Sequence, residues 1–288
     1  MSPFISSGAL GVRDVRAALK RCRDAGITHL ELASGLECPG DQWALVEEAS
    51  DDMSFLLHNY FPAPVDPFVL NLAALDDDML ERSLAFCRRA IDLSQRINAP
   101  FYSTHAGFAL PLTPSDLGNP EALKKKAQPG EVQRATAMAR FKSSVQSLSE
   151  YAAKKNVILL LENNVVAGNS FVTGADHGLL LVDSEEICDF FTSLNLENIG
   201  LLADVGHAKV SAQTLGFDLN DWLEKVQPFI RAFHLSDNDG QRDNNQVFDG
   251  SAWFMPQLQS LDETPRVIEV YNIDDETIND LMVHASSS

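Results

Sequence analysis

The sequence is short of cysteine and of long apolar runs, and both shortages exclude classes of protein. Its four cysteines lie far apart and form no Cys-x-x-Cys pair, so no disulfide framework is expected and the thiols are predicted to be reduced. No run approaches the roughly 18 apolar residues of a membrane-spanning helix. The first residues, Met1 to Ile5, lack the basic region and apolar stretch of a signal peptide. We therefore expect a cytoplasmic protein with no membrane segment.

Basic residues are also scarce. The 288 residues include 22 Lys and Arg against 41 Asp and Glu, which gives a net charge of −19. A protein that follows a phosphate backbone usually carries a basic face. The balance therefore argues against a nucleic-acid partner, although a local basic face could survive in an acidic chain. The length suits a single α/β barrel, which typically takes about 250 residues.

What the sequence does have is a repeated pattern of short apolar runs, each ending in a residue able to bind a metal. The clearest covers residues 157–162, Val-Ile-Leu-Leu-Leu-Glu, and stops at Glu162. A continuous run this short is typical of a strand buried on both faces, and a charge at its end is costly unless something pairs with it. The same pattern recurs at Met53–His58, Phe101–His105, Ile199–Asp204, Ile230–His234 and Arg266–Glu269.

Two further short strands, Phe4–Ile5 and Ile27–Leu32, precede these six, and the last strand is expected to continue to Tyr271. Helical segments lie between the strands. They are predicted at Val12–Ala25, Trp43–Ala49, from Asp76 onward, at Glu131–Lys155, Ser184–Leu194, Leu219–Val226 and Asp274–Val283. This alternation, without linker-like composition, predicts one α/β domain over residues 1–288, a single (β/α)₈ TIM barrel. The polar, proline-containing residues 109–130 after the fourth strand are expected to be an insertion.

In a closed parallel barrel the strand ends meet at one mouth, where barrel enzymes carry their catalytic residues. The sharpest hypothesis is a divalent metal held there by the ends of the last four strands. The predicted ligands are Glu162, Asp204, His234 and Glu269. Carboxylates with one imidazole suit Mn²⁺, Mg²⁺, Co²⁺ or Zn²⁺, and the sequence does not choose among them. The alternative is that each is an ordinary strand-end residue facing water, which is the weaker interpretation for four residues at one mouth.

Histidines end two earlier strands and follow a third. His58 and His105 are predicted to bind substrate hydroxyls or, with Glu162 as a bridge, a second metal; the alternative is a hydrogen-bonded core histidine. His207, three residues after Asp204, is a candidate to contact substrate or to support a ligand. The remaining histidines are given no role. They are His29, His177 and His284.

Six stretches resemble the xylose isomerase-like superfamily, which contains sugar and sugar-phosphate isomerases and epimerases together with endonuclease IV-type enzymes. They are Leu70–Ala73, Ser103–Phe108, Leu161–Asn164, Asp204–His207, His234–Gly240 and Val267–Glu269. The resemblance covers nearly the whole length and is specific for the superfamily rather than for one activity. It implies that the four predicted ligands hold the catalytic metal, and that His58 and His105 match a pair that binds an additional zinc in the endonuclease branch.

One loop departs from the endonuclease pattern. That pattern has Asp-x-His after the seventh strand, whereas residues 243–250 read Asp-Asn-Asn-Gln-Val-Phe-Asp-Gly and contain no histidine. The missing histidine argues against a three-metal cluster and, with the net charge, against a nuclease. The Lys124–Lys126 run could steer a phosphate, but a lysine run is more often a solvated helix face.

The sequence thus predicts an isomerase or epimerase of a small carbohydrate, with or without a phosphate. Glu162 and Glu269 are the predicted catalytic pair, one removing a proton beside a carbonyl and the other returning it. The alternatives are an endonuclease IV-like phosphodiesterase and a lyase acting on a keto-sugar or inositol, which would begin with the same proton abstraction. Whether the chain forms a homo-oligomer is left open.

Overall fold

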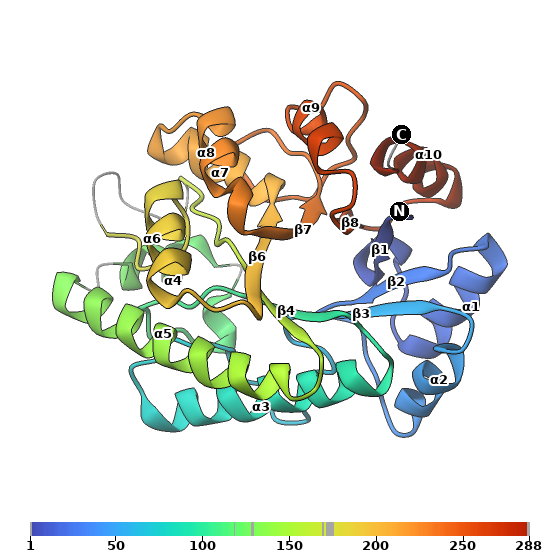
Figure 1. Cartoon of the computed structure of the whole chain (residues 1–288), viewed down its shortest axis with the longest axis horizontal. Coiled ribbons are helices and arrows are strands. Elements are labelled where there is room, and N and C mark those ends of the chain that lie inside the picture. The colour runs from blue at the N-terminus through green and yellow to red at the C-terminus, as the bar shows by residue number, and fades with distance from the viewer. Residues whose placement is uncertain (1, 118, 128–129, 169, 171–175, 287–288) are drawn as a thin grey trace.

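The computed structural model describes residues 2–117, 119–127, 130–168, 170 and 176–286. Eight parallel strands run in chain order and close into a barrel, with β8 beside β1 (Figure 1). The strands are β1 (Phe4–Ser6), β2 (His29–Leu32), β3 (Ser54–His58), β4 (Phe101–His105), β5 (Ile158–Glu162), β6 (Ile199–Asp204), β7 (Ile230–Leu235) and β8 (Arg266–Ile268). The (β/α)₈ prediction is confirmed.

Helices surround the strands (Figure 1). They are α1 (Val15–Ala25), α2 (Gln42–Ala49), α3 (Asp77–Arg96), α4 (Pro120–Lys126), α5 (Gly130–Ala153), α6 (Ser184–Leu194), α7 (Val205–Leu215), α8 (Leu219–Val226), α9 (Met255–Leu258) and α10 (Asp275–Ala285). Short 3₁₀ turns lie at Ser7–Leu10, Pro114–Asp116, Gln227–Phe229 and Gln259–Leu261. Among the described residues, no helix is both long enough and apolar enough to cross a membrane.

Aspartate caps many of these helices, which is one use of the acidic composition. The side chain at the N-cap accepts a hydrogen bond from a backbone N–H of the first turn, satisfying a donor that has no partner within the helix. The capping residues are Asp14 for α1, Asp76 for α3, Asp183 for α6, Asp204 for α7, Asp218 for α8 and Asp274 for α10. Each cap fixes the residue at which its helix begins.

The barrel interior is built in layers, because side chains two residues apart on a strand share a face. Seven strands contribute one residue each to a buried apolar cluster: Phe4, Leu56, Phe101, Leu160, Leu202, Ala232 and Val267. Two residues later on the same strands the side chains are polar: Ser6, His58, Ser103, Glu162, Asp204, His234 and Glu269. An apolar layer therefore supports a polar layer at the carboxyl ends of the strands.

Several segments differ from the sequence-based predictions, among them α9, which was not predicted, and β2, which begins at His29 rather than Ile27. Helix α7 was not predicted; it begins directly after β6 because Asp204 is at once the last strand residue and the N-cap. Strand β8 ends at Ile268 rather than Tyr271, so Glu269 lies just beyond it. The predicted polar insertion, apart from residues outside the described ranges, contains helix α4 and buries Ala109, Leu110 and Ala127.

Candidate metal centre

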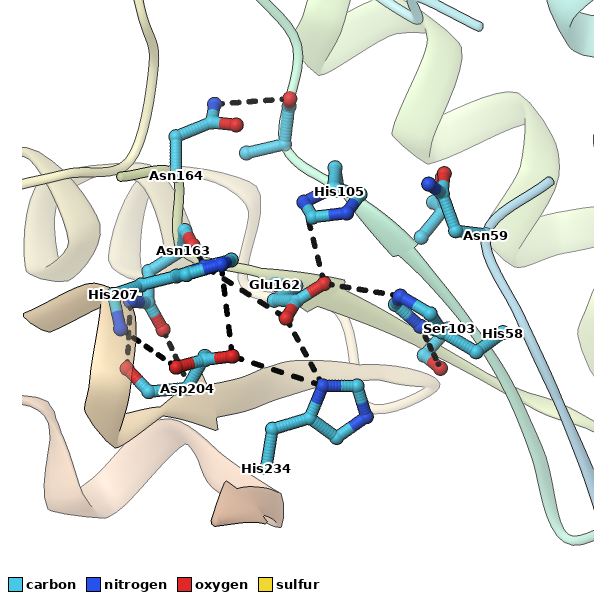
Figure 2. A network of polar contacts seen from close by, with 12 residues as sticks. His58, Asn59, Ser103, His105, Glu162, Asn163, Asn164, Asp204, His207 and His234 are labelled. Carbon is cyan, nitrogen blue, oxygen red and sulfur yellow. Dashed lines mark hydrogen bonds and ion pairs between the residues drawn. The ribbon is translucent and has the colours of Figure 1, made fainter. Parts of the chain in front are cut away.

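The seven residues predicted from the sequence lie together at the mouth of the barrel. Figure 2 shows the side chains of six of them directed toward one another, with Glu162 at the middle. The seventh, Glu269, contacts the same group through His234. Their side chains are almost wholly buried except that of His105, which is 37% exposed. The strand-end pattern in the sequence therefore identified one cluster.

Glu162 contacts four imidazoles. Its Oε2 lies 3.3 Å from Nε2 of His58 and 3.3 Å from Nδ1 of His105. Its Oε1 lies 3.1 Å from Nδ1 of His234 and 3.8 Å from Nδ1 of His207. Burial alone would raise the pKa of Glu162, but the histidines outweigh burial and hold it well below its usual value. Glu162 is therefore an anion at the centre of the cluster.

His234 contacts three carboxylates of the cluster through Nδ1. Its Nδ1 lies 3.0 Å from Oε2 of Glu269 and 3.8 Å from Oδ2 of Asp204, in addition to the Glu162 contact. Burial lowers the pKa of His234, but nearby carboxylates, led by Glu31 and followed by Glu269, more than offset this and raise it well above its usual value. In contrast, burial lowers the pKa of His58 to about 3, so that imidazole is neutral at physiological pH.

Asp204 and His207 are held by the start of α7. Oδ1 of Asp204 accepts from the backbone N–H of His207 at 2.7 Å, which leaves Oδ2 directed into the cluster. The side chain of Asn163 fixes the strand end on both sides: its Oδ1 accepts from the N–H of Asp204 and its Nδ2 donates to the carbonyl of that residue. The backbone carbonyl of Asn163 also lies 2.8 Å from Nδ1 of His207.

His207 has a carboxylate partner that the sequence analysis did not assign. Oδ2 of Asp243 lies 3.2 Å from Nε2 of His207. Asn245 stands where the endonuclease pattern has its histidine, and its amide donates to the backbone carbonyl of Glu269. Within the described residues, no third histidine, cysteine or carboxylate forms a metal-sized group with His207 and Asp243.

The residues present fit a divalent cation. Oε2 of Glu162 and Oδ2 of Asp204 are buried carboxylate oxygens without a hydrogen-bond partner. Burial, together with the nearby carboxylates of Glu162 and Glu269, raises the pKa of Asp204 well above its usual value, and a bound cation would offset the cost of burying these carboxylates in the charged form. In the described part of the chain, no lysine or arginine forms an ion pair with any carboxylate of the cluster. Three sets of atoms converge closely enough to hold an ion: Glu162, Asp204, His234 and Glu269; His58, His105 and Glu162; and Glu31, His58 and His234.

Sequence reasoning missed two carboxylates of the cluster, Asp243 and Glu31. Asp243 follows β7 in a polar loop where an aspartate gives no pattern of its own. Glu31 lies within β2, and its Oε2 is 3.0 Å from Nε2 of His234. The sequence does contain a signal for Glu31, because a carboxylate between Leu30 and Leu32 is unusual if both faces of the strand are buried.

The three histidines given no role lie in other surroundings. His29 begins β2 rather than lying in mid-strand, and its ring packs edge-on against Phe4 with centroids 5.0 Å apart. His177 accepts a hydrogen bond from the backbone N–H of Leu179 in the loop before α6. His284 lies in the last turn of α10. The Lys124–Lys126 run is on α4, where Lys126 is paired with Asp116.

Comparisons with known proteins identify the family to which the chain belongs. The sequence model of the xylose isomerase-like TIM barrel family matches residues 19–280. The probable endonuclease 4 of Thermoplasma acidophilum is 26% identical over 191 residues, which are 63% of this chain and 53% of that protein. The chain thus spans about half the length of this curated relative.

Solved structures resemble the chain over almost its full length. A D-tagatose 3-epimerase-like protein superposes with a TM-score of 0.71 at 18% identity, covering 99% of this chain and 97% of the other. D-psicose 3-epimerase from Clostridium cellulolyticum, solved with D-tagatose, gives 0.65 at 12% identity, covering 99% and 96%. At these identities the two structures establish the shared fold alone.

Proposed function

Because the chain belongs to the xylose isomerase-like TIM barrel family, we propose that it is a divalent-metal-dependent isomerase or epimerase of a sugar or sugar phosphate. The observation that carries the proposal is the buried group of carboxylates and imidazoles at the barrel mouth, with two carboxylate oxygens lacking a hydrogen-bond partner. Such a group suits metal-assisted chemistry on a small polar molecule. The sugar epimerases among its structural neighbours support a carbohydrate substrate.

The proposed ligands of the catalytic ion are Glu162, Asp204, His234 and Glu269. Once bound, a divalent ion polarises a carbonyl oxygen and makes the adjacent C–H more acidic. Mn²⁺, Mg²⁺, Co²⁺ and Zn²⁺ all suit this donor set. We propose that His58 and His105 bind substrate hydroxyls or, with Glu162, a second ion. Their nitrogens lie 3.3 Å from the same carboxylate oxygen, which places both within reach of one bound atom.

Glu162 and Glu269 are the proposed catalytic residues. Glu162 ends β5 and Glu269 follows β8, so the two carboxylates approach the cluster from different sides of the barrel. One would take the proton from the carbon beside the carbonyl, and the other would return a proton to the opposite face or to the neighbouring carbon. The two carboxylates differ in environment: Glu162 is fully buried among histidines, whereas the Glu269 side chain is 12% exposed. His207 is the proposed third substrate contact.

Metal binding is expected to stabilise the fold. A ligand that binds only the folded state at a hundred times its Kd adds about 2.7 kcal/mol, which corresponds to roughly 5 °C or more in thermal midpoint for a protein of this size. Protein stripped with a chelator should therefore unfold at a lower temperature than protein with added Mn²⁺, Co²⁺ or Zn²⁺, as measured by calorimetry. Asp204→Asn is the control and should show no such shift. Equal midpoints for stripped and metal-loaded wild-type protein would count against the site.

The activity itself is tested by a substrate screen. Chelator-stripped protein, reloaded with each of the four ions, is incubated with D-tagatose, D-psicose, D-fructose and their phosphates, and products are separated by chromatography. We expect metal-dependent conversion of at least one ketose to an isomer or epimer. Loss of water from a substrate would favour the lyase alternative. Absence of conversion for every ketose with every ion would contradict the proposal.

The endonuclease alternative has one observation in its favour, the partial match to a probable endonuclease 4. We nevertheless expect weak binding to DNA containing an abasic site and no metal-dependent incision at 0.15 M salt. The reason is the net charge of −19, because an acidic surface repels the phosphate backbone and few basic groups are available to neutralise phosphates. Gel-based incision assays with the metal-loaded protein measure this. Efficient, metal-dependent cleavage would place the endonuclease function first.

A further inference from the structure

We propose that Glu31 is a positioning residue that orients His234 as a metal ligand by accepting the hydrogen of its Nε2. The inference rests on the metal site of the proposed function but not on the substrate. Glu31 lies within β2, two residues after His29, and its backbone pairs with Ser6 of β1 and Leu56 of β3. The alternation along β2 therefore places its side chain in the polar layer of the barrel interior.

Glu31 is placed where its charge is expensive. The residue is wholly buried, its Oε1 has no hydrogen-bond partner, and its Oε2 contacts Nε2 of His234 at 3.0 Å. Within the described residues, no lysine or arginine pairs with it. A buried carboxylate with one partner is commonly less favourable for stability than a well-packed apolar residue of similar size. A requirement other than packing therefore accounts for a carboxylate at this position.

The carboxylate of Glu31 is needed to orient the ring of His234, whose two nitrogens face different groups. Nε2 faces Glu31, while Nδ1 lies 3.1 Å from Glu162 and 3.0 Å from Glu269. An ionised carboxylate only accepts hydrogen bonds, so the contact with Glu31 places the ring hydrogen on Nε2. Nδ1, which faces the proposed ligand group, is then the nitrogen that would give up its proton and bind the ion. A histidine that binds a metal commonly donates its other N–H to such a carboxylate, which fixes the tautomer and the ring orientation.

Two substitutions separate this role from a packing role. Glu31→Leu removes the acceptor and fills a similar volume, whereas Glu31→Gln keeps a carbonyl oxygen that can accept from Nε2. We expect Zn²⁺ affinity, measured by calorimetric titration of stripped protein, to fall about 10- to 100-fold for Glu31→Leu, and by less for Glu31→Gln. The metal-free Glu31→Leu protein should unfold at or above the wild-type temperature, because an apolar side chain replaces a buried carboxylate while His234 keeps Glu162 and Glu269 as partners. Glu37→Gln, at an exposed carboxylate beyond the same strand, is the matched control.

The tautomer gives a readout that packing would not change. Long-range ¹H–¹⁵N spectra of Zn²⁺-loaded protein labelled at histidine should show His234 with its hydrogen on Nε2, and Glu31→Leu should lose or weaken that signal. Wild-type Zn²⁺ affinity in Glu31→Leu, or a wild-type ring with its hydrogen on Nδ1, would overturn the inference. Loss of a Zn²⁺ equivalent in Glu31→Gln as well would show direct ligation by Glu31 and would also overturn it. If the wild-type protein bound no divalent ion, the proposed function itself would fail.

Discussion

Glu162→Gln is expected to lower the turnover of a ketose substrate by about 10³-fold, within the 10²- to 10⁴-fold range of a lost general base. Glutamine keeps the size of the side chain but cannot take up a proton. It also removes the negative charge that four imidazoles surround. Turnover is measured by chromatography of the epimer or isomer formed at saturating metal, together with the metal content of each preparation. Glu150→Gln, at an exposed position on α5, is the control and should keep wild-type turnover.

The companion variant Glu269→Gln should lose turnover as well, because the proposed mechanism needs both carboxylates. Metal content decides how the result is interpreted. Loss of activity with metal retained supports proton transfer by the glutamate, whereas joint loss of both assigns it a ligand role. Full turnover in either variant with metal bound would contradict the catalytic assignment.

Asp204→Asn and His234→Ala are expected to remove the catalytic ion, with an affinity loss exceeding the 10- to 100-fold typical of a residue that only supports a ligand. Asparagine lacks the negative charge but can still accept from the N–H of His207, so the cap of α7 is kept. Asp204→Ala would lose that cap too, at about 0.5–2 kcal/mol. Metal content is measured by elemental analysis after dialysis, and the fold by circular dichroism.

Comparison of the two Asp204 variants separates metal binding from helix capping. Both should lose the ion, while only Asp204→Ala should lose stability in the metal-free state. An Asp204→Asn protein that retained one equivalent of metal after dialysis would show that Asp204 is not a ligand. A barrel that failed to fold with His234→Ala would leave Asp204→Asn as the decisive variant.

The barrel and the position of its mouth could be predicted from the sequence because a strand buried on both faces appears as an unbroken run of apolar residues. A strand such as Ile158–Glu162 is aliphatic until it leaves the packed interior, and its first polar residue marks the mouth. Applied to several strands, this rule brought His58, Glu162, Asp204 and His234 together without any knowledge of their distances. The structure confirms that these side chains lie in one cluster.

Some features could not be predicted because they depend on how the barrel closes, on the path of a loop, or on one residue that belongs to two elements. Glu31 is a single carboxylate between leucines, and only closure of the barrel, which places β8 beside β1, shows that it reaches His234 on β7. Asp243 lies in a loop, and the spacing of apolar residues does not predict the path of a loop. Helix α7 was missed because Asp204 ends a strand and caps a helix in the same position, which leaves no loop to separate the two elements.

Solvent isotope exchange tests the central claim most directly. Metal-loaded protein is incubated in D₂O with the ketose that the screen shows to be converted, and the product and recovered substrate are examined by mass spectrometry and NMR. The account predicts deuterium at the carbon that loses its proton, with exchange abolished in Glu162→Gln and Glu269→Gln even where metal is retained. Complete turnover with no deuterium in the product would indicate hydride transfer instead, and the two glutamates would then be ligands and not bases.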